Sequence, residues 1–340
     1  MPTCFKRFLR FLVVTTVAGL CVATSRGSDD TNTVYLFSYF TDERSGLCFA
    51  YSFDGWHWTN VAGTFLIPQV GGKLMRDPSI ARGQDGEWHL VWTTAWRNEN
   101  GFGYAHSKDF VHWSEQQFIP AMQHEPAVHN VWAPELFYDE KEKQFIICWA
   151  STIPGRFPEH GEPRDNNHRM FFTTTRDFKT FAPTKLYLDP GFSVIDCKIL
   201  KDGDRYVLLL KDNSRPQCNI RIAFAETPLG PWKDFSAPFT KQYAEGPCAL
   251  KIGDDWLIYY EAYRAKHYCA AKTRDFTDFT DVTADMTFPQ PMKHGTAFKA
   301  STQDLDRLLK DSKTEQLPVS TSVLQTTNLP ATQTSSNHVR

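Results

Sequence analysis

The sequence predicts an all-β fold built from repeated antiparallel sheets, and two recurring segments carry this prediction. The first consists of an apolar strand, a short polar turn and an aromatic residue. Its five copies span residues 47–58, 102–113, 170–181, 220–232 and 268–279. Four copies place a Ser or Thr two residues before an Asp, as in Ser52 and Asp54. This pattern favours tight turns because such side chains hydrogen-bond to the nearby backbone.

The second segment consists of a short strand, a polar turn and a strongly apolar or aromatic strand, and is therefore a predicted hairpin. Each copy lies just upstream of a copy of the first segment, and the four copies span residues 76–94, 133–151, 194–212 and 245–263. Together the two segments make a four-stranded antiparallel unit of about 50–60 residues, which is the size of a β-propeller blade.

The two ends of the repeat region supply one more blade. Four complete units run from residue 76 to residue 279, which leaves strand-like segments at 33–40, 47–58 and 294–301. We therefore predict a five-bladed β-propeller over residues 30–302, closed by pairing a C-terminal inner strand with N-terminal strands. Such closure removes free sheet edges. The alternative is a β-sandwich whose hairpins recur by coincidence.

The N-terminus is typical of an export signal. Lys6, Arg7 and Arg10 precede an apolar run over residues 11–23, which is shorter than the roughly 20 residues of a membrane-spanning helix. We expect a signal peptide over residues 1–25, cleaved after Ser25, and an exported protein (periplasmic or extracellular) without stable membrane insertion. An uncleaved membrane anchor is the alternative. At the other end, residues 303–340 predict a short helix followed by a disordered tail rich in Ser and Thr.

Charge and cysteine content exclude some partners. The formal net charge is −2, and because residues 1–25 hold three basic side chains and no acidic one, the remainder carries −5. Such a surface disfavours nucleic acid. Of the eight cysteines, six lie beyond the signal, mostly within apolar strands and with no CxxC pair, so a zinc site is not expected. We expect buried thiols, with one disulfide left open, and a monomer.

Polar residues recur at the start of the predicted inner strands. Four of them precede the aromatic residue of the next strand by 10 or 11 positions, and a fifth begins the last inner strand: Asp77, Glu135, Asp196, Glu245 and His294. Singly, each is consistent with an ordinary turn. Because inner strands line the central channel, we expect all five at one register and at one mouth. Clustered carboxyls raise one another's pKa values, which marks a candidate functional site.

The ordered motifs RDPSI at Asp77, WAPEL at Trp132, VID at Asp196, EGP at Glu245 and HG at His294 resemble glycoside hydrolase family 43. These five-bladed propellers are mostly arabinofuranosidases, xylosidases and arabinanases that act with inversion. The resemblance implies that Asp77 is the general base and Glu245 the general acid, and that Asp196 orients the acid and tunes its pKa.

The same resemblance bears on two further residues of the channel. His294 matches a histidine that in some family members helps to hold calcium or water. The resemblance therefore allows a structural calcium ion here, although it implies no required cofactor. Glu135 stands where the family motif usually has Asp, and we assign it to substrate binding.

The physical requirements of an inverting glycosidase agree with this assignment. One carboxyl must be protonated and another ionised, about 6.5–9.5 Å apart, to admit water. We expect Asp196 to raise the pKa of Glu245 by like-charge repulsion. For substrate binding we select two tryptophans, Trp132 and Trp96 (which lies beside Arg97), because aromatic rings offer an apolar face to a sugar. We also select Arg156, which lies in the insertion 152–168.

The leading interpretation is an exported, exo-acting glycosidase that releases α-L-arabinofuranosyl residues from plant-type polysaccharides or oligosaccharides. A β-D-xylosidase on the same scaffold is the nearest alternative. A retaining fructosidase is disfavoured because the chain lacks an Asn-Asp-Pro-Asn stretch and an accompanying β-sandwich domain. A non-catalytic sugar-binding propeller is disfavoured because it needs no three convergent carboxylates. The long predicted loops at 114–131 and 152–168 favour a pocket at the mouth of the channel, and a pocket in turn favours exo action.

Overall fold

The computed structural model describes residues 1, 32–44, 46–158 and 166–315. The predicted signal peptide and the predicted tail from residue 316 onward lie outside the described residues. The described strands are β1 (Thr33–Phe40), β2 (Leu47–Ser52), β3 (Thr59–Leu66), β4 (Arg76–Arg82), β5 (Trp88–Thr93), β6 (Phe102–Ser107), β7 (Gln117–Ile119), β8 (Trp132–Asp139), β9 (Gln144–Ser151), β10 (Arg169–Thr175), β11 (Lys185–Leu188), β12 (Val194–Asp202), β13 (Arg205–Asp212), β14 (Asn219–Ala225), β15 (Ala244–Ile252), β16 (Asp255–Ala262), β17 (His267–Thr273), β18 (Thr280–Asp281) and β19 (Lys293–Ser301). A 3-10 turn lies at Thr283–Asp285, and the helix α1 spans Thr302–Glu315.

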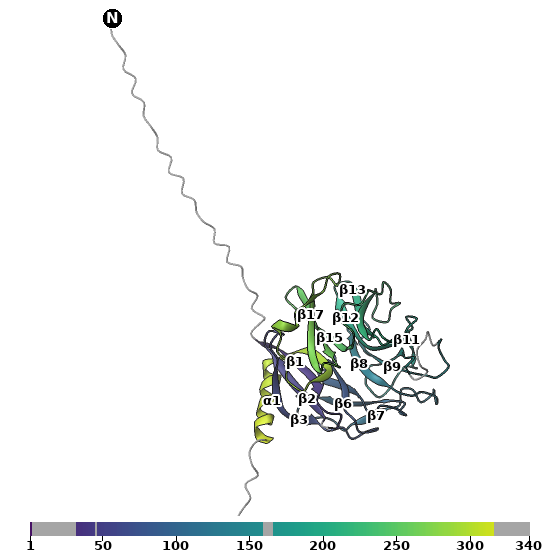
Figure 1. Cartoon of the computed structure of the whole chain (residues 1–340). Coiled ribbons are helices and arrows are strands. Elements are labelled where there is room, and N and C mark those ends of the chain that lie inside the picture. Colours follow the sequence, from purple (N-terminus) through teal and green to yellow (C-terminus); the bar gives the residue numbers. More distant parts are fainter. Residues whose placement is uncertain (2–31, 45, 159–165, 316–340) are drawn as a thin grey trace, which may run out of the picture. The chain divides into compact units, whose positions relative to one another are not determined.

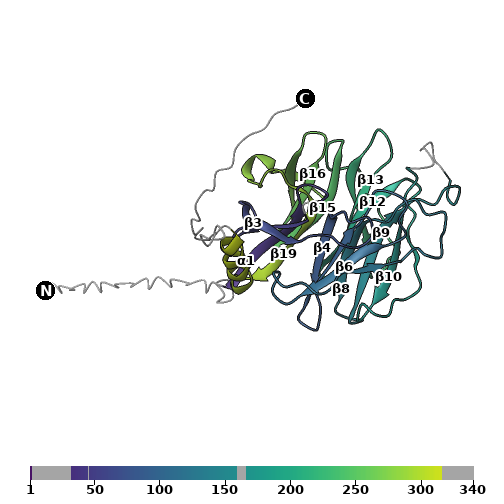
Figure 2. The ribbon, with the colours of Figure 1, turned by 90° about the horizontal axis from the view of Figure 1, so that it is seen from below.

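The strands form five small antiparallel sheets arranged as a five-bladed propeller (Figures 1 and 2), which confirms the predicted fold. The sheets have the orders β4-β5-β6-β7, β8-β9-β10-β11, β12-β13-β14, β15-β16-β17-β18 and β19-β1-β2-β3. The innermost strands β4, β8, β12, β15 and β19 each contact the next, and β19 contacts β4. This cycle closes the ring. As predicted, the last blade combines a C-terminal inner strand with three N-terminal strands.

The third sheet has three strands where the repeat predicts four. Beyond β14 the chain returns along the sheet edge through an isolated bridge between Phe224 and Lys233 and through two further backbone hydrogen bonds, which Ser236 and Phe239 donate to β14. This returning segment contains Pro238. Because proline has no backbone N–H to donate, the segment bonds to β14 at separate points rather than as a continuous strand.

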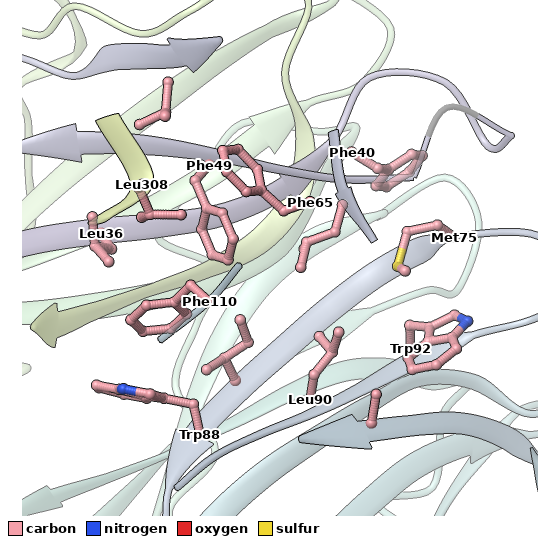
Figure 3. Packing of buried hydrophobic residues seen from close by; sticks show 14 of the residues in the cluster. Leu36, Phe40, Phe49, Phe65, Met75, Trp88, Leu90, Trp92, Phe110 and Leu308 are labelled. Carbon is pink, nitrogen blue, oxygen red and sulfur yellow. The ribbon is translucent and has the colours of Figure 1, made fainter. Parts of the chain in front are cut away.

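Apolar clusters fill the space between neighbouring blades. The largest joins the closing sheet to the first complete blade; Figure 3 shows Phe49, Phe65 and Phe110 together, with Leu308 of α1 beside them. Helix α1 thus covers the closing blade with buried Leu305 and Leu308.

Two further findings in the described part of the chain concern the state of the cysteines and the search for a membrane-spanning helix. All six cysteines there are free and buried, as predicted for packing residues. No helix among those residues is both long and apolar enough to span a membrane.

Candidate active site

A one-residue bulge interrupts every inner strand at the same end of the ring. In β4 the pairing shifts from Arg76 opposite Thr93 to Ser79 opposite Val91, so three steps along β4 match two along β5. Strands β8, β12, β15 and β19 show the same shift. Bulges of this kind occur next to active sites because they re-aim side chains.

The bulges define which residues are structurally equivalent. The first bulged residues are Asp77, Ala133, Asp196, Gly246 and His294, and the first four have positive φ angles of 52°, 46°, 54° and 61°. This left-handed region is strained for residues other than glycine, although Asp tolerates it better than most. Three of the five equivalent positions thus hold a residue other than glycine in this region, and two of these three are aspartates.

This register corrects the expectation that all five polar residues occupy the same position along their inner strands. Glu245 lies one residue before the bulged position of β15, and Glu135 lies two residues after that of β8. The number of residues between each polar residue and the aromatic residue of the following strand does not give its position along the inner strand, because the hairpin turns differ in length. For example, Arg82 pairs with Trp88, whereas Asp202 pairs with Arg205.

Asp77 and His294 form a buried ion pair across two blades. The Nδ1 atom of His294 lies 3.2 Å from Asp77 Oδ1, and Thr93 donates to Asp77 Oδ2 at 2.8 Å. Burial by itself would raise the pKa of Asp77, but the hydrogen bond and charge of His294 outweigh it and lower the pKa to about 2. Burial would likewise lower the pKa of His294, but Asp196 and Asp77 outweigh it and raise the pKa to about 9. At neutral pH, therefore, Asp77 is ionised and His294 is a cation.

Asp196 is held against the next inner strand. The backbone N–H of Gly246 donates to Asp196 Oδ2 at 3.1 Å. Burial raises the pKa of Asp196, and the charges of Glu245 and Asp77 add to this effect, against the attraction of His294 and Lys211. The two equivalent aspartates thus have pKa values shifted in opposite directions.

A glycine is required where this contact forms. A Cβ atom on Gly246 would lie 2.5 Å from His294 Cγ, and the residue has a positive φ angle. The imidazole of His294 therefore packs directly against the backbone of β15.

Glu245 lies on the wall of a cavity of about 380 Å³ that also exposes Glu261 and His294. Lys211 Nζ donates to Glu245 Oε2 at 2.8 Å, and the side chain of Lys211 is only 4% exposed. The charges of Glu245 and Asp196 raise the pKa of Lys211 above its ordinary value, because they outweigh the opposing effect of burial. A permanent cation therefore touches the predicted general acid.

Glu135 belongs to a separate cluster deeper in the channel. It contacts the ammonium group of Lys198 and accepts a hydrogen bond from Ser79 Oγ at 2.8 Å. Like Asp77 and Asp196, Glu135 is buried and does not line the cavity beside Glu245. Its partners, Lys198 and Ser79, set it apart from the other predicted carboxyls.

The side chains around His294 do not fit the calcium ion that the family resemblance allows. Calcium takes about six to eight oxygen ligands, whereas His294 offers ring nitrogens, one of which already contacts Asp77 at 3.2 Å. The carboxylate of Glu135 is already neutralised by Lys198. Within the ranges that the structure describes, no group of three or more His, Cys, Asp or Glu side chains is arranged to hold a metal.

The cavity mouth contains one of the predicted sugar-binding aromatics. Trp96 is 47% exposed, lines the cavity, and carries the guanidinium of Arg76 over its ring at 3.9 Å. Its Nε1 donates to Glu43 at 2.9 Å. The other aromatic walls are Phe40 and Tyr263.

The remaining predicted binding residues lie outside this cavity. Trp132 packs edge-on against Trp96 at 5.8 Å and donates to the Trp96 carbonyl, so it supports Trp96. Arg156 forms an ion pair with Glu125 at 3.0 Å and is absent from the cavity wall. A larger cavity of about 560 Å³, near Ile119 and Phe181, has no carboxyl among its lining residues.

Sequence reasoning missed Lys211 and Glu261, although a signal was present. Each is a charged residue that follows an apolar or aromatic run: LLLK in β13 and IYYE in β16. Charged side chains are almost never buried unless paired. A charged residue at the end of a buried strand therefore indicates a partner at the same end of the ring.

Comparisons with known proteins identify the family and agree with the fold. The family model described as "Probable glycosyl hydrolase domain" matches residues 30–306. Similar solved structures include a Cellvibrio cellulosa α-L-arabinanase complexed with arabinohexaose (TM-score 0.51, 13% identity, 77% of this chain and 95% of that chain). Another is a family-43 β1,3-galactosidase with galactodeoxynojirimycin (TM-score 0.52, 11% identity, 73% and 90%). No curated protein sequence gives a significant match.

A third similar structure is the family-43 protein BlXynB from Bacillus licheniformis (TM-score 0.52, 13% identity, 77% of this chain and 54% of that chain). The chain thus spans about half the length of that protein. At these identities the structural similarity shows the fold alone, whereas the family model spans the whole propeller. The chain therefore belongs to the glycosyl hydrolase family related to glycoside hydrolase family 43, and it is a glycoside hydrolase of the family-43 type.

Proposed function

We propose that the protein is an exported, inverting, exo-acting glycosidase that releases α-L-arabinofuranosyl residues from plant-type polysaccharides or oligosaccharides. One observation carries the catalytic part of this proposal. Asp77 is held ionised on one blade by His294 and Thr93, while Glu245 lies on the cavity wall of another blade. An inverting glycosidase needs a base and an acid on opposite sides of the scissile bond.

In the proposed reaction, Asp77 accepts a proton from the attacking water, and Glu245 gives its proton to the departing glycosidic oxygen. Thr93 holds Oδ2 of Asp77 and His294 contacts Oδ1, and together they fix the orientation of the carboxylate. Asp196 positions the backbone of β15 next to Glu245 through the N–H of Gly246. Each residue of the predicted acid–base set thus has a separate part in the reaction.

The cavity supports recognition of a single sugar unit. Its volume is about 380 Å³, and Phe40, Trp96 and Tyr263 form aromatic walls against which the apolar face of a sugar can stack. The choice of arabinofuranose follows the family resemblance. Among the similar structures, one is named an arabinanase and another a galactosidase, so an assay must compare sugars directly.

The first experiment measures hydrolysis of aryl α-L-arabinofuranoside, β-D-xyloside and β-D-galactoside, and of the matching oligosaccharides, by the wild type, Asp77→Asn and Glu245→Gln. General acid or base catalysis contributes about 10²- to 10⁴-fold, and we expect losses of this size. Asp77→Asn should lose activity equally on every leaving group. Glu245→Gln should lose less on activated aryl glycosides than on oligosaccharides, because a good leaving group needs little protonation.

Asp139→Asn is the matched control, since Asp139 is a buried carboxyl at the opposite end of β8. It should retain wild-type activity. If either site variant keeps more than about a tenth of the wild-type rate on oligosaccharides, the assignment of acid and base is wrong. NMR of the first-formed product should show the anomer opposite to that of the substrate. Retention of configuration would contradict the inverting mechanism.

Export has its own test. The full chain is expressed in a secreting host, and the N-terminus of the recovered protein is sequenced. Cleavage after Ser25 predicts that the mature chain begins at Arg26. A membrane-bound product that still carries residue 1 would instead support the anchor.

A further inference from the structure

Arg76 is a cation in the wall of the cavity, and it directly precedes the predicted base in the chain. It begins β4 and pairs with Thr93, just before the bulge at Asp77. Its side chain is 16% exposed and lines the same cavity as Glu245. The acid–base reaction proposed above gives Arg76 no part.

Two aromatic rings hold the guanidinium group of Arg76. Its Cζ atom lies 3.9 Å from the ring centroid of Trp96 and 5.1 Å from that of Phe40. Both distances are within the roughly 6 Å over which a cation is attracted to the face of an aromatic ring. Phe40 ends β1, whereas Trp96 follows β5. The guanidinium group therefore lies where the closing blade meets the first complete blade.

Glu43 adds a hydrogen bond to these two ring contacts. Arg76 Nη1 donates to Glu43 Oε1 at 2.8 Å, and Trp96 Nε1 donates to the same carboxylate at 2.9 Å. The Glu43 carbonyl in turn accepts from the backbone N–H of Met75 at 2.8 Å. Arg76 is thus positioned before any ligand arrives, so binding costs it little side-chain freedom.

Most of the hydrogen-bond donors of Arg76 stay available. A guanidinium group carries five N–H donors in a rigid planar fork. Across the described ranges of the chain, the hydrogen bonds and ion pairs of this side chain engage Nη1 alone. Because the side chain lines the cavity, its other N–H groups can meet a molecule bound there. Such a fork matches two neighbouring acceptor oxygens.

The charges of the cavity favour uncharged acceptors. Glu43 already neutralises Arg76. The other charged side chains of the lining are two carboxyls, two lysines and the imidazole that pairs with Asp77, namely Glu245, Glu261, Lys266, Lys293 and His294. The cavity therefore offers no surplus of positive charge to an acidic sugar, whereas the hydroxyl oxygens of a neutral sugar need none.

We infer that Arg76 is a substrate-binding residue whose guanidinium group donates hydrogen bonds to two neighbouring hydroxyl oxygens of the neutral sugar bound in the cavity. The inference rests on the proposed function, because it takes this cavity as the substrate site. In an arabinofuranosyl unit the neighbouring hydroxyls are those at C2 and C3. Glu43 and the two rings hold the fork in place for them.

The test combines an enzyme variant with substrates that lack one hydroxyl. The assay measures kcat/KM for aryl α-L-arabinofuranoside and for its 2-deoxy and 3-deoxy analogues; if the first experiment selects another sugar, the deoxy analogues of that sugar replace them. Arg76→Met keeps an unbranched apolar side chain beside the two rings but removes every donor. It should lower kcat/KM on the complete substrate at least tenfold, as expected for hydrogen bonds from a charged group.

The two kinds of loss should not multiply. The wild type should lose at least tenfold on each deoxy analogue, whereas Arg76→Met should hydrolyse the complete and the deoxy substrates at similar rates. A purely structural role of Arg76 would not remove the preference for the hydroxyls. If Arg76→Met discriminates against the deoxy analogues as strongly as an active wild type does, the inference is wrong while the proposed function stands.

Arg76→Lys separates the fork from the charge. Lysine keeps the positive charge but not the planar pair of donors, so this variant should resemble Arg76→Met. Wild-type kinetics in Arg76→Lys would overturn the assignment of the fork.

Arg205→Met is the matched control. Arg205 also lies over an aromatic ring, 4.7 Å from the centroid of Phe224, and it pairs with Asp202 at 3.1 Å. It begins β13, at the opposite end of that strand from Lys211. This variant should keep wild-type kinetics on all three substrates. A loss equal to that of Arg76→Met would show that both effects are structural and would overturn the inference.

A binding measurement needs no catalysis. Isothermal titration compares methyl α-L-arabinofuranoside, methyl β-D-xyloside, methyl β-D-galactoside and methyl β-D-glucuronide. Arg76→Met should weaken binding of the preferred neutral glycoside at least tenfold, and Arg205→Met should not. Binding that is equal in wild type and Arg76→Met, or absent from both, would overturn the inference, as would tightest binding of the glucuronide. If the wild type hydrolyses no glycoside, the proposed function fails, and this comparison still decides whether Arg76 holds a sugar.

Discussion

Replacing His294 with glutamine tests the buried ion pair that orients Asp77. The imidazole contacts Asp77 at 3.2 Å, and its side chain is 15% exposed. Glutamine keeps the ability to donate a hydrogen bond but cannot carry a positive charge. The variant therefore separates the charge of His294 from its packing.

The size of the effect follows from the pKa of His294, which rises from 6.5 to about 9 on folding. Since one pH unit corresponds to about 1.4 kcal/mol, the carboxylates of Asp196, Asp77 and Glu245 together stabilise the folded state by about 3 kcal/mol when His294 is protonated. A folded pKa above the unfolded value means that the stabilisation is fully present below pH 6.5 and is lost as pH rises through 9. The free-energy difference between wild type and His294→Gln should therefore shrink over this range.

Thermal unfolding at pH 6.0 and pH 9.5 measures this change. At roughly 2 °C per kcal/mol for a protein of this size, the gap in Tm between wild type and variant should narrow by about 6 °C. His112→Gln is the matched control, because His112 contacts Asp109 at 2.9 Å with 85% of its side chain exposed. Solvent screens that pair, so its gap should hardly change. A constant gap for His294→Gln would refute the buried charge pair.

Two further predictions concern packing. Gly246→Ala should lower kcat at least tenfold, since a Cβ atom would lie 2.5 Å from His294 Cγ. Steady-state kinetics measures this loss, and a wild-type kcat would show that the imidazole of His294 can move freely. Leu308→Ala should destabilise the protein by about 2–5 kcal/mol, the usual range for a buried leucine, with unchanged kcat, because α1 packs on the closing blade rather than on the cavity. Urea unfolding measures this loss, and a change below about 1 kcal/mol would mean that α1 adds little to closure.

The fold was predictable because its information is local and repeated. Each blade has its own hairpins and turns, and the leftover segments at both ends could complete a ring in one way. The blade with three strands departed from the prediction for an equally local reason, since its fourth segment contains Pro238 and bonds to β14 only at separate points.

The site was only partly predictable. Asp77, Asp196, Glu245 and His294 were selected from their places at the starts of inner strands, and the structure brings them into contact with one another or with shared neighbours. Glu135 was selected by the same rule but belongs with Lys198, two residues deeper. The spacing between polar and aromatic residues was counted through hairpin turns of unequal length. It therefore could not show that Glu245 and Glu135 lie one or two positions away from the bulged residue of their strands.

The sequence by itself determined the number of blades, the order of the strands and the acidic residues that begin the inner strands. Tertiary structure decided how these acids are charged, because protonation depends on neighbours from other blades and strands. Thr93 and Glu261 face their carboxyls across the hairpins β4–β5 and β15–β16, whereas Lys211 reaches Glu245 from a different blade. Burial makes each unpaired charge costly, so the protonation of the site is set by which strands the ring places side by side.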